Sequence, residues 1–571
     1  MEETVYDPLE RYKSVYRDEF RKNAQSAFDE LAAKAKIDKE ANKLLCEQIA
    51  QTSETRNGLS ASLSRYSVVR VACWALAIAL FLVWALCEHP MAPFALLLFP
   101  IAVCANLFLF NKKIRELREK IGNLDEEIRR KKDEAWKQME PLNALFDWDI
   151  PARLFEKTVP KIHFDGFFTE SRIGELVNDF GYDGSLNENA SVLFSQSGEI
   201  NGNPFVVANM KTFEMGEKTY TGYKTIHWTE TVTGFDGKRH RVVRSQTLSA
   251  SIARPCPFYG KRSFVLYGND AAPNLAFTRK PSNLVDDGFL QDFRRKRKLR
   301  KLEKFSRNLK DESQYTLMGN REFETLFETM DRNDEVEYRL LFTALAQKQM
   351  LSLIREKTDA YGDDFSFFKS RKINVVVPGH LNDFDMDTNP ERFARYSYEE
   401  SRNNFLGINR EYFRAVYFSL APLLCIPLYQ QIRSQKEIYK KKSPRSSFWE
   451  WESIANFYGI ETFRHPGCVT DCILKTREET DKGGGGSRRI AVTAHGFSGT
   501  NRIEYVPVFG GDGRTHAVPV PWVEYEPVSK TSSIVIEESD NSQKSRAIHG
   551  LQAGEIYRRG IFSSRPQKGR M

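Results

Sequence analysis

Two long apolar runs near the N-terminus dominate the hydrophobic pattern of the chain. Residues 71–87 form an unbroken apolar run of 17, and residues 91–110 form a second run of 20 without a charge. Because a bilayer core about 30 Å thick needs roughly 20 helical residues, this pattern predicts a transmembrane helical hairpin over residues 67–110. A buried hairpin in a soluble protein is the alternative, but buried helices of this length without a polar face are rare.

Basic residues on either side of the two runs predict how the hairpin is oriented. The turn between the runs, residues 88–90, contains no Lys or Arg. The flanks do, at Arg56, Arg65, Arg70, Lys112, Lys113, Arg115, Arg118 and Lys120. The positive-inside rule therefore predicts a two-pass protein of the cytoplasmic (inner) membrane, with both termini in the cytoplasm.

Helical periodicity continues on both sides of the hairpin. In both flanking segments, residues 1–66 and residues 111–144, seam positions recur at alternating spacings of three and four. The seam before the hairpin, which has two polar interruptions, consists of Leu45, Ile49, Thr52, Arg56, Leu59, Leu63 and Tyr66. The seam after the hairpin consists of Ile114, Leu117, Ile121, Leu124 and Ile128. Heptad seams are typical of helices that pair. We therefore predict amphipathic cytosolic helices and an antiparallel helical stalk; packing of these helices on a globular domain is the alternative.

Beyond residue 145 the period changes from helix to strand. Alternating runs rich in Thr, Val and aromatic residues predict strands at residues 204–210, 223–233, 241–252 and 264–267, with a hairpin turn at residues 234–237. We expect the segment Arg254-Pro255-Cys256-Pro257 to end the third strand. Helical periodicity from Asn320 and a strand at residues 372–377 complete a first α+β cytosolic domain, residues 145–378.

Short motifs in this region occur in an order that resembles a known family. The segment Tyr182-Asp183-Gly184 precedes the hairpin strands, and the acidic helical segment RNDEVEYRLL, residues 332–341, precedes the apolar helix and the strand at residues 372–377. Together with the transmembrane hairpin, this order resembles an uncharacterised bacterial family of two-span membrane proteins (domain of unknown function 3137) over residues 60–378. The resemblance implies a bacterial membrane protein and supplies no activity and no site residues.

A second α+β cytosolic domain is predicted over residues 379–537. Its apolar stretch Ala415–Tyr429 is too short to span a bilayer, which favours a buried core helix over a re-entrant segment. Strands are predicted at residues 489–494, 502–509, 516–525 and 532–536, with a hairpin at residues 510–513. The polar tail, residues 538–571, is predicted to be disordered. The predicted fold class is thus α+β: a transmembrane helical hairpin and stalk followed by two mixed modules with antiparallel sheets.

Composition narrows the class of protein. The 571 residues are 41% hydrophobic, which is too apolar for a disordered chain and too polar for a many-span transporter. Eight cysteines exclude a disulfide-built scaffold and suit a reducing compartment. The net charge of +8 is a mild excess, so nucleic acid is disfavoured as a partner.

The densest cluster of positive charge lies between the first strands and the helices that follow. Its seven cations are Arg294, Arg295, Lys296, Arg297, Lys298, Arg300 and Lys301. Each cation near an anionic bilayer contributes about 1 kcal/mol of attraction, so we predict contact with anionic lipid headgroups. RNA is less favoured because no aromatic residues interleave the cations, and a solvated helix face is the plain alternative.

Two further patterns suggest chemistry in the second domain. His465, Cys468 and Cys472 have the spacing H-x2-C-x3-C and are a candidate set of three zinc ligands, for which His495 or His516 would supply the fourth; ordinary buried thiols are the alternative. The segment His495–Gly499 resembles the oxyanion turn of α/β-hydrolases, but the chain has no G-x-S-x-G nucleophile elbow. We therefore assign no catalytic or cofactor-binding residue and expect no cofactor.

These observations favour a membrane-anchored binding or scaffold protein that faces the cytosol. Its expected partners are the lipid bilayer and another membrane or membrane-associated protein, and a homo-oligomer is a further alternative. A second hypothesis is a membrane-bound enzyme, hydrolase-like or metal-dependent, with its site in the C-terminal module. A third is an accessory subunit of a transporter or channel, which is weaker because neither predicted span contains a charge.

Overall fold

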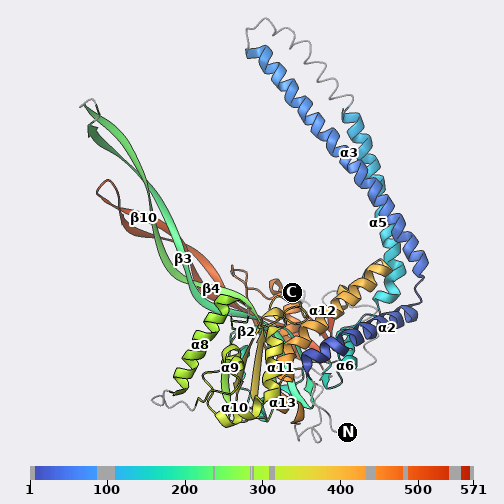
Figure 1. Cartoon of the computed structure of the whole chain (residues 1–571). Helices are drawn as coiled ribbons and strands as arrows, with labels where there is room; N and C mark the ends of the chain where they lie inside the picture. Colours follow the sequence, from blue (N-terminus) through green and yellow to red (C-terminus); the bar gives the residue numbers. More distant parts are fainter. Residues whose placement is uncertain are drawn as a thin grey trace. The chain divides into compact units, whose positions relative to one another are not determined.

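A computed structural model of the chain has the predicted α+β class, with two antiparallel sheets (Figure 1). It describes residues 7–86, 110–233, 235, 238–282, 284–285, 288–307, 315–432, 445–479, 487–538 and 555–565. The chain divides into two compact units. We call Ala24–Asp147 with Asn389–Asn409 the helical unit, and Met1–Asn23, Trp148–Thr388 and Arg410–Met571 the mixed unit.

Two long helices dominate the helical unit: α3 (Lys39–Leu86) and α5 (Asn111–Asn143). Three side-chain hydrogen bonds fix their register: Arg56 to Asp125 at 2.9 Å, Lys131 to Thr52 at 3.4 Å, and Arg70 to Asn111 at 3.3 Å. Residue numbers rise along α3 as they fall along α5, so the pair is antiparallel. The predicted antiparallel pairing of these helices is confirmed, and a stalk that rises from a membrane stays a prediction.

Most of the predicted seam faces the partner helix in this pair, but Tyr66, also predicted in the seam, is exposed. Leu45, Ile49, Ile114 and Leu117 are buried, whereas neighbouring positions such as Leu44 are exposed. A seam of this kind needs only one apolar position in three or four, so the other positions of a paired helix can be polar.

The first predicted span continues α3 as far as its last described residue, Leu86. Val68, Val71 and Ile78 expose more than half of their surface near this end. Within the described residues, no helix combines the length and the apolar character needed to cross a membrane. Except for Phe110, the second predicted span, residues 91–110, lies outside the described part of the chain.

The first sheet, in the mixed unit, has seven strands in the order β1-β2-β3-β4-β7-β6-β5. Their bounds are Ile162–Phe164 (β1), Ala190–Ile200 (β2), Asn203–Thr233 (β3), Arg239–Gly268 (β4), Ala276–Arg279 (β5), Phe365–Ser370 (β6) and Ile373–Pro378 (β7). The turn between β2 and β3 is Asn201-Gly202, with φ of 51° and 80°, and positive φ at both residues is what a two-residue type I′ hairpin requires.

The second sheet has five strands in the order β11-β12-β10-β9-β8. They are Ile473–Glu478 (β8), Arg488–Phe509 (β9), Thr515–Glu538 (β10), Glu555–Arg558 (β11) and Ile561–Ser564 (β12). The prediction of a disordered tail over residues 538–571 is therefore wrong for residues 555–564. These residues form strands because part of the tail is buried. Ile561 is fully buried in the core of this sheet, and Arg559 forms a buried ion pair with Glu450 at 3.2 Å.

We expected the two sheets in separate modules divided at residue 378, but both belong to the mixed unit. Helix α14 (Phe448–Phe457) explains why. Its Trp449 packs in the core of the first sheet, while its Trp451 and Ile454 pack in the core of the second. One helix thus buries apolar surface of both sheets, so neither sheet has a core independent of it.

The remaining helices and short turns belong to one or the other of the two units, and the helices Arg17–Ala35 and Tyr398–Leu424 each have residues in both. The α-helices are Pro8–Arg11 (α1), Arg17–Ala35 (α2), Ile150–Thr158 (α6), Glu170–Asn178 (α7), Phe289–Arg307 (α8), Arg321–Phe327 (α9), Glu335–Leu341 (α10), Ala344–Arg355 (α11), Tyr398–Leu424 (α12) and Pro427–Gln431 (α13). The shorter turns are Tyr12–Tyr16 (η1), Ser185–Asn187 (η3), Gly379–Leu381 (η4), Pro390–Arg392 (η5) and Ile460–Thr462 (η7). The apolar stretch Ala415–Tyr429 is buried in the mixed unit, as a core helix should be.

Two very long hairpins, β3–β4 and β9–β10, extend from the body of the mixed unit side by side (Figure 1). We call residues 213–259 and 496–527 the β-arm. The sequence predicts four strands where β3 and β4 are continuous, and Pro255 and Pro257 do not end the third. Both prolines pair with β3 on one side only, and an edge strand tolerates a missing backbone donor on its unpaired side.

A small apolar core holds the two hairpins of the β-arm together. It contains Ile226 and Leu248 from the first hairpin and Val518 and Val520 from the second, all buried. Gly222 makes the close approach possible, because a Cβ at this position would lie 2.0 Å from the carbonyl oxygen of Pro519.

Candidate functional site

A pocket of about 390 Å³ opens between strands of both sheets in the mixed unit. We call it the His495 pocket. Its lining is mostly apolar with a few polar groups; the lining residues are Glu188, Asn189, Phe213, Tyr259, Ile473, Lys475, His495, Gly496, Phe497, Pro527, Val528 and Ser529. Apolar walls with a few polar groups are the usual make-up of small-molecule sites.

The ammonium group of Lys475 bonds to neighbouring residues of the mixed unit. It donates to the carbonyl oxygens of Asn187 and Ala190, at 2.6 and 2.8 Å, and forms an ion pair with Glu452 at 3.1 Å. Glu452 lies on α14, and burial raises its pKa to about 7. Lys475 therefore ties α14 to β8 and offers the pocket its aliphatic stem.

His495 is the titratable group best placed to act in this pocket. Partial burial and the nearby Lys475 cation lower its pKa, so its imidazole is mainly neutral at pH 7. Ser529 lies directly opposite it in the β9–β10 register, but no hydrogen bond joins the two side chains in the described part of the chain. A serine nucleophile needs a base within hydrogen-bond reach, so Ser529 and His495 do not have the geometry of a nucleophile and its base.

The candidate zinc residues are only partly brought together. The sulfur atoms of Cys468 and Cys472 lie 3.6 Å apart beneath Gly496, whereas His465 accepts a hydrogen bond from the Gly467 amide at 3.0 Å. In the ranges that the structure describes, no group of three His, Cys, Asp or Glu side chains is placed to hold a metal ion. His516, proposed as a fourth ligand, pairs with Asp512 at 3.0 Å near the tip of the β-arm.

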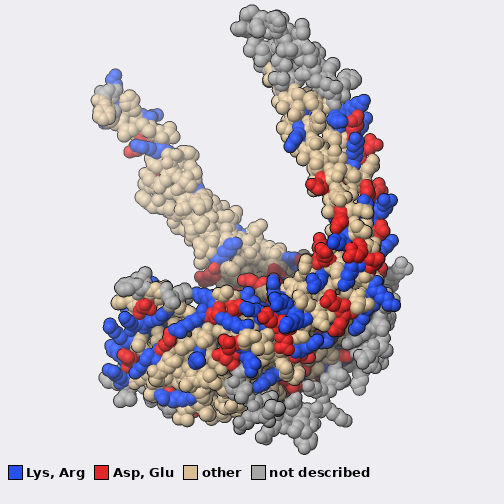
Figure 2. Space-filling model, turned by 45° about the vertical axis from the view of Figure 1, so that its right-hand side comes forward, with Lys and Arg blue, Asp and Glu red and all other residues tan. Residues whose placement is uncertain are grey.

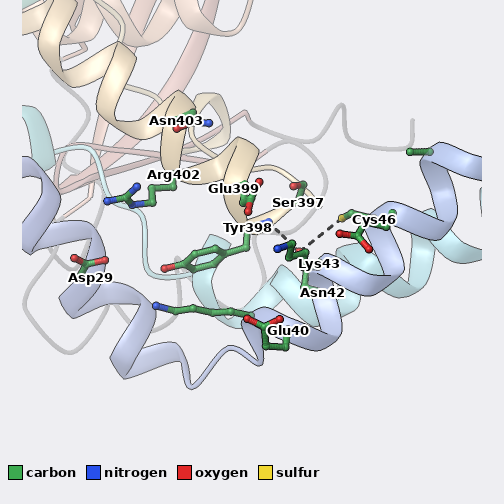
Figure 3. A pocket seen from close by; sticks show the side chains of 13 residues that line it. Asp29, Glu40, Asn42, Lys43, Cys46, Ser397, Tyr398, Glu399, Arg402 and Asn403 are labelled. Carbon is green, nitrogen blue, oxygen red and sulfur yellow. Dashed lines mark hydrogen bonds between the residues drawn. The ribbon is translucent and has the colours of Figure 1, made fainter.

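A larger cavity, of about 770 Å³, lies in the helical unit between α2, the start of α3 and the start of α12 (Figure 3). Anionic and cationic side chains alternate around it, from Asp29 and Glu399 to Lys43 and Arg402 (Figure 3). The buried Asn42 donates to the carbonyl oxygen of Tyr396 at 3.0 Å and accepts from the Tyr398 amide at 2.9 Å. These bonds hold α3 against the start of α12, and the mixed charge selects no ligand of one sign.

The predicted basic cluster lies on α8, and the structure divides its seven cations into two groups. Arg295 donates to the carbonyl oxygens of Leu284 and Val285, at 2.6 and 3.0 Å, and Lys298 forms an ion pair with Glu328. The exposed members are Arg294, Lys296, Arg297, Arg300 and Lys301. Two cations therefore dock the helix and five give it a positively charged surface.

The β-arm carries an apolar surface that the sequence analysis missed. Ile503, Tyr505 and Phe509 are 60%, 65% and 70% exposed. Directly opposite residues of an antiparallel pair share a face, so the outer face of β9–β10 consists of Ile503, Tyr505, Pro507, Phe509, Ala517, Pro519 and Pro521. None of these is charged, and most of the arm in Figure 2 is drawn without charged side chains. The available signal was apolar residues at consecutive positions, YVPVF at residues 505–509 and AVPVPWV at residues 517–523, which gives each strand two apolar faces.

Comparisons with known proteins add no identification. No family model, no curated protein and no solved structure matches the chain. The resemblance to the uncharacterised membrane family therefore stays a prediction, and the surfaces described above are interpreted from their own residues.

Proposed function

We propose that the chain is a membrane-anchored binding protein that holds a protein partner on the outer face of its β-arm. The observation that carries the proposal is the row of exposed side chains Ile503, Tyr505 and Phe509 on a face without charge. Burying each of them against a partner would contribute about 1.5–3 kcal/mol. Large exposed apolar patches on a folded protein mark interaction sites.

The chemistry of this face favours a protein with a complementary apolar stripe over the other candidate partners. Nucleic acid binding depends on cations that meet phosphates, and the outer face has none. Insertion into lipid hydrocarbon requires every backbone group to be paired. Among the described strands, β9 has no neighbour on its outer edge beyond His495, so its backbone groups there would enter hydrocarbon unpaired.

Membrane anchoring is supported by the sequence and by the register of the stalk. The three hydrogen-bonded pairs between α3 and α5 all centre on residues 90–92, within a few residues of the turn that the sequence places at residues 88–90. The exposed Val71 and Ile78 lie in the first of these runs, and the exposed Val68 lies just before it. We propose that the runs form the two-pass anchor, with the stalk and both termini in the cytoplasm.

We further propose that the five exposed cations of α8 contact anionic lipid headgroups. The support is their exposure on one helix, combined with a chain that carries its own anchor. In full-length protein reconstituted in nanodiscs, α8 should exchange its amide hydrogens more slowly with anionic than with neutral lipid. Equal exchange in the two lipids would contradict this contact.

Site-specific photo-crosslinking tests the partner surface. A benzoylphenylalanine at position 505 points outward, and the same group at position 506 points into the arm core, so adjacent positions form a matched pair. In the cells that produce the full-length protein, we expect position 505 to yield one protein adduct and position 506 only crosslinks within the chain. The partner, once identified and purified, should bind the chain at least tenfold more weakly after Tyr505→Ser.

Other outcomes would overturn the proposal. These are an adduct at position 505 to lipid, nucleic acid or a second copy of this chain, or equal adducts at positions 505 and 506. Unchanged affinity of the purified partner for the Tyr505→Ser chain would do the same. Because Tyr505 is exposed, its replacement should leave the melting temperature unchanged.

A further inference from the structure

Cys468 and Cys472 are the two thiols that the fold brings into contact. Six free cysteines lie in the described part of the chain, and these two have their sulfur atoms 3.6 Å apart. Cys468 is 6% exposed and Cys472 is 1% exposed, beneath a loop whose Val469 is 58% exposed. Both thiols are therefore buried, and the segment that carries them reaches the surface at Val469.

Gly496, the residue opposite the two thiols, leaves the space that their sulfur atoms fill. A Cβ at Gly496 would lie 2.5 Å from the sulfur of Cys468 and 2.9 Å from that of Cys472. Any larger residue at position 496 would force the two sulfur atoms out of their present positions. The contact between the thiols therefore depends on β9 as well as on the loop.

The environments of the two thiols differ. Burial opposes ionisation of Cys468, but hydrogen bonds with Thr470, Cys472 and Arg464 outweigh it and lower its pKa. Burial, together with the neighbouring Cys468 sulfur, raises the pKa of Cys472 to about 12. Cys468 is also the more exposed of the two residues. Because the thiolate is the nucleophile in sulfur chemistry, Cys468 is the member of the pair suited to attack first.

We propose that Cys468 and Cys472 form a reversible dithiol–disulfide couple that hydroperoxides oxidise, with Cys468 as the attacking sulfur. The Cys468 thiolate attacks the terminal peroxide oxygen and the O–O bond breaks. The leaving group, hydroxide from hydrogen peroxide or an alkoxide from an organic hydroperoxide, takes a proton to become water or an alcohol. The resulting sulfenic acid is attacked by the Cys472 sulfur, the S–O bond breaks, and water leaves with the thiol proton. The two sulfur atoms lose two electrons and the peroxide gains them; exchange with an external dithiol restores the couple.

Thr470 connects this couple to the His495 pocket. Its hydroxyl oxygen lies 3.7 Å from the Cys468 sulfur, accepts a hydrogen bond from the Phe497 amide at 3.0 Å, and lies 3.2 Å from the Tyr259 hydroxyl. Phe497 and Tyr259 both line the pocket. Closing a disulfide across the three residues between the cysteines displaces Thr470, so the oxidised form has an altered pocket wall.

Peptide mass spectrometry on the purified full-length protein tests the redox step. Both cysteines fall on one tryptic peptide, residues 465–475, which should lose two hydrogen atoms on treatment with hydrogen peroxide at least tenfold faster than Cys425 is oxidised. Cys425 is the matched control because it is fully buried. A Cys472→Ser chain should trap a sulfenic acid on Cys468, detected with dimedone, and a Cys468→Ser chain should leave Cys472 unreacted.

Hydrogen exchange tests the connection to the pocket. The peptide that contains Phe497 should exchange faster in the disulfide form, and Thr470→Val in the reduced protein should reproduce this change. Unchanged far-ultraviolet circular dichroism would show that the fold survives in each case. The proposal is overturned if the peptide stays reduced in the folded protein, oxidises no faster than Cys425, traps equally in both serine variants, or forms the disulfide without a change at Phe497.

Discussion

The stalk is a long antiparallel pair of helices and the β-arm is a pair of long antiparallel hairpins, and different contacts stabilise them. The stalk joins α3 and α5 along a seam with apolar residues at most third or fourth positions, and the rest of its surface is largely polar before the exposed Val68, Val71 and Ile78 near the end of α3. The β-arm joins two hairpins through a core as small as Ile226, Leu248, Val518 and Val520, and leaves a second apolar face exposed. A helix pair can bury most of its large apolar side chains in one seam, whereas a strand presents two faces. The exposed apolar face of the arm therefore does not contribute to the stability of the fold.

The largest effect that this comparison predicts is at the core of the arm. Val518→Asp places a carboxylate in a fully buried apolar site, and an uncompensated buried charge costs several kcal/mol, on the order of 3–5. We expect the two hairpins to separate, with faster hydrogen exchange around Ile226 and Leu248. Ala517→Asp, on the exposed face one residue away, is the control and should leave exchange unchanged. Similar exchange in the two variants would show that the small core does not hold the arm together.

The next effect is on the stalk. Leu117→Ala removes a buried seam residue, and large-to-small changes of this kind cost about 2–4 kcal/mol. We expect a lower melting temperature for the helical signal at 222 nm in the full-length chain. Leu44→Ala removes the same atoms from an exposed site on α3 and should change the melting temperature little. Equal losses in the two variants would mean that the seam is not the source of stability.

Two glycine substitutions should have opposite signs in the two regions. Gly222→Ala in the arm would place a Cβ 2.0 Å from the Pro519 carbonyl oxygen, and overpacking of this kind costs about 1–3 kcal/mol. Gly58→Ala in α3 meets nothing within 4 Å and should stabilise by about 0.5–1 kcal/mol, because alanine favours a helix over glycine. Thermal unfolding of the full-length chain measures both. The same sign for both would contradict the close approach of the hairpins.

The smallest effect concerns the ion pair that fixes the register of the stalk. Arg56 and Asp125 are both more than a third exposed, and such pairs contribute about 0.2–1 kcal/mol, less at high salt. Arg56→Ala should shift the melting temperature slightly at low ionic strength and negligibly at high ionic strength. A large loss that persists in salt would mean that this contact, and not the apolar seam, holds the helices together.

The same contrast explains how much of the fold the sequence could predict. The stalk was predictable because Ile114 and Leu117 repeat with a period that only a helix produces. The arm was divided into shorter strands because Pro255 and Pro257 usually end a strand, and a sequence does not say which edge of a strand is unpaired. Burial of Ile561 in the second sheet depends on contacts distant in the chain, so the tail could not be placed.

The candidate site was predictable only as a set of residues. Cys468 and Cys472 are close in sequence, and the fold brings them into contact, but the space that Gly496 leaves for them comes from another strand. The role of Lys475 depends on Glu452 and Asn187, which no local pattern connects to it. The outer face of the arm required the register of β9 with β10, because only register shows which residues share a face.

Alkaline extraction of membranes from cells that produce the full-length protein tests the central claim most directly. If the apolar runs anchor the stalk, the chain should stay in the membrane pellet at high pH, and a chain that lacks residues 71–110 should move to the supernatant. A wild-type chain that leaves the membrane fraction in alkali, or that is recovered without detergent as a monodisperse species, would contradict the anchored binding protein proposed above.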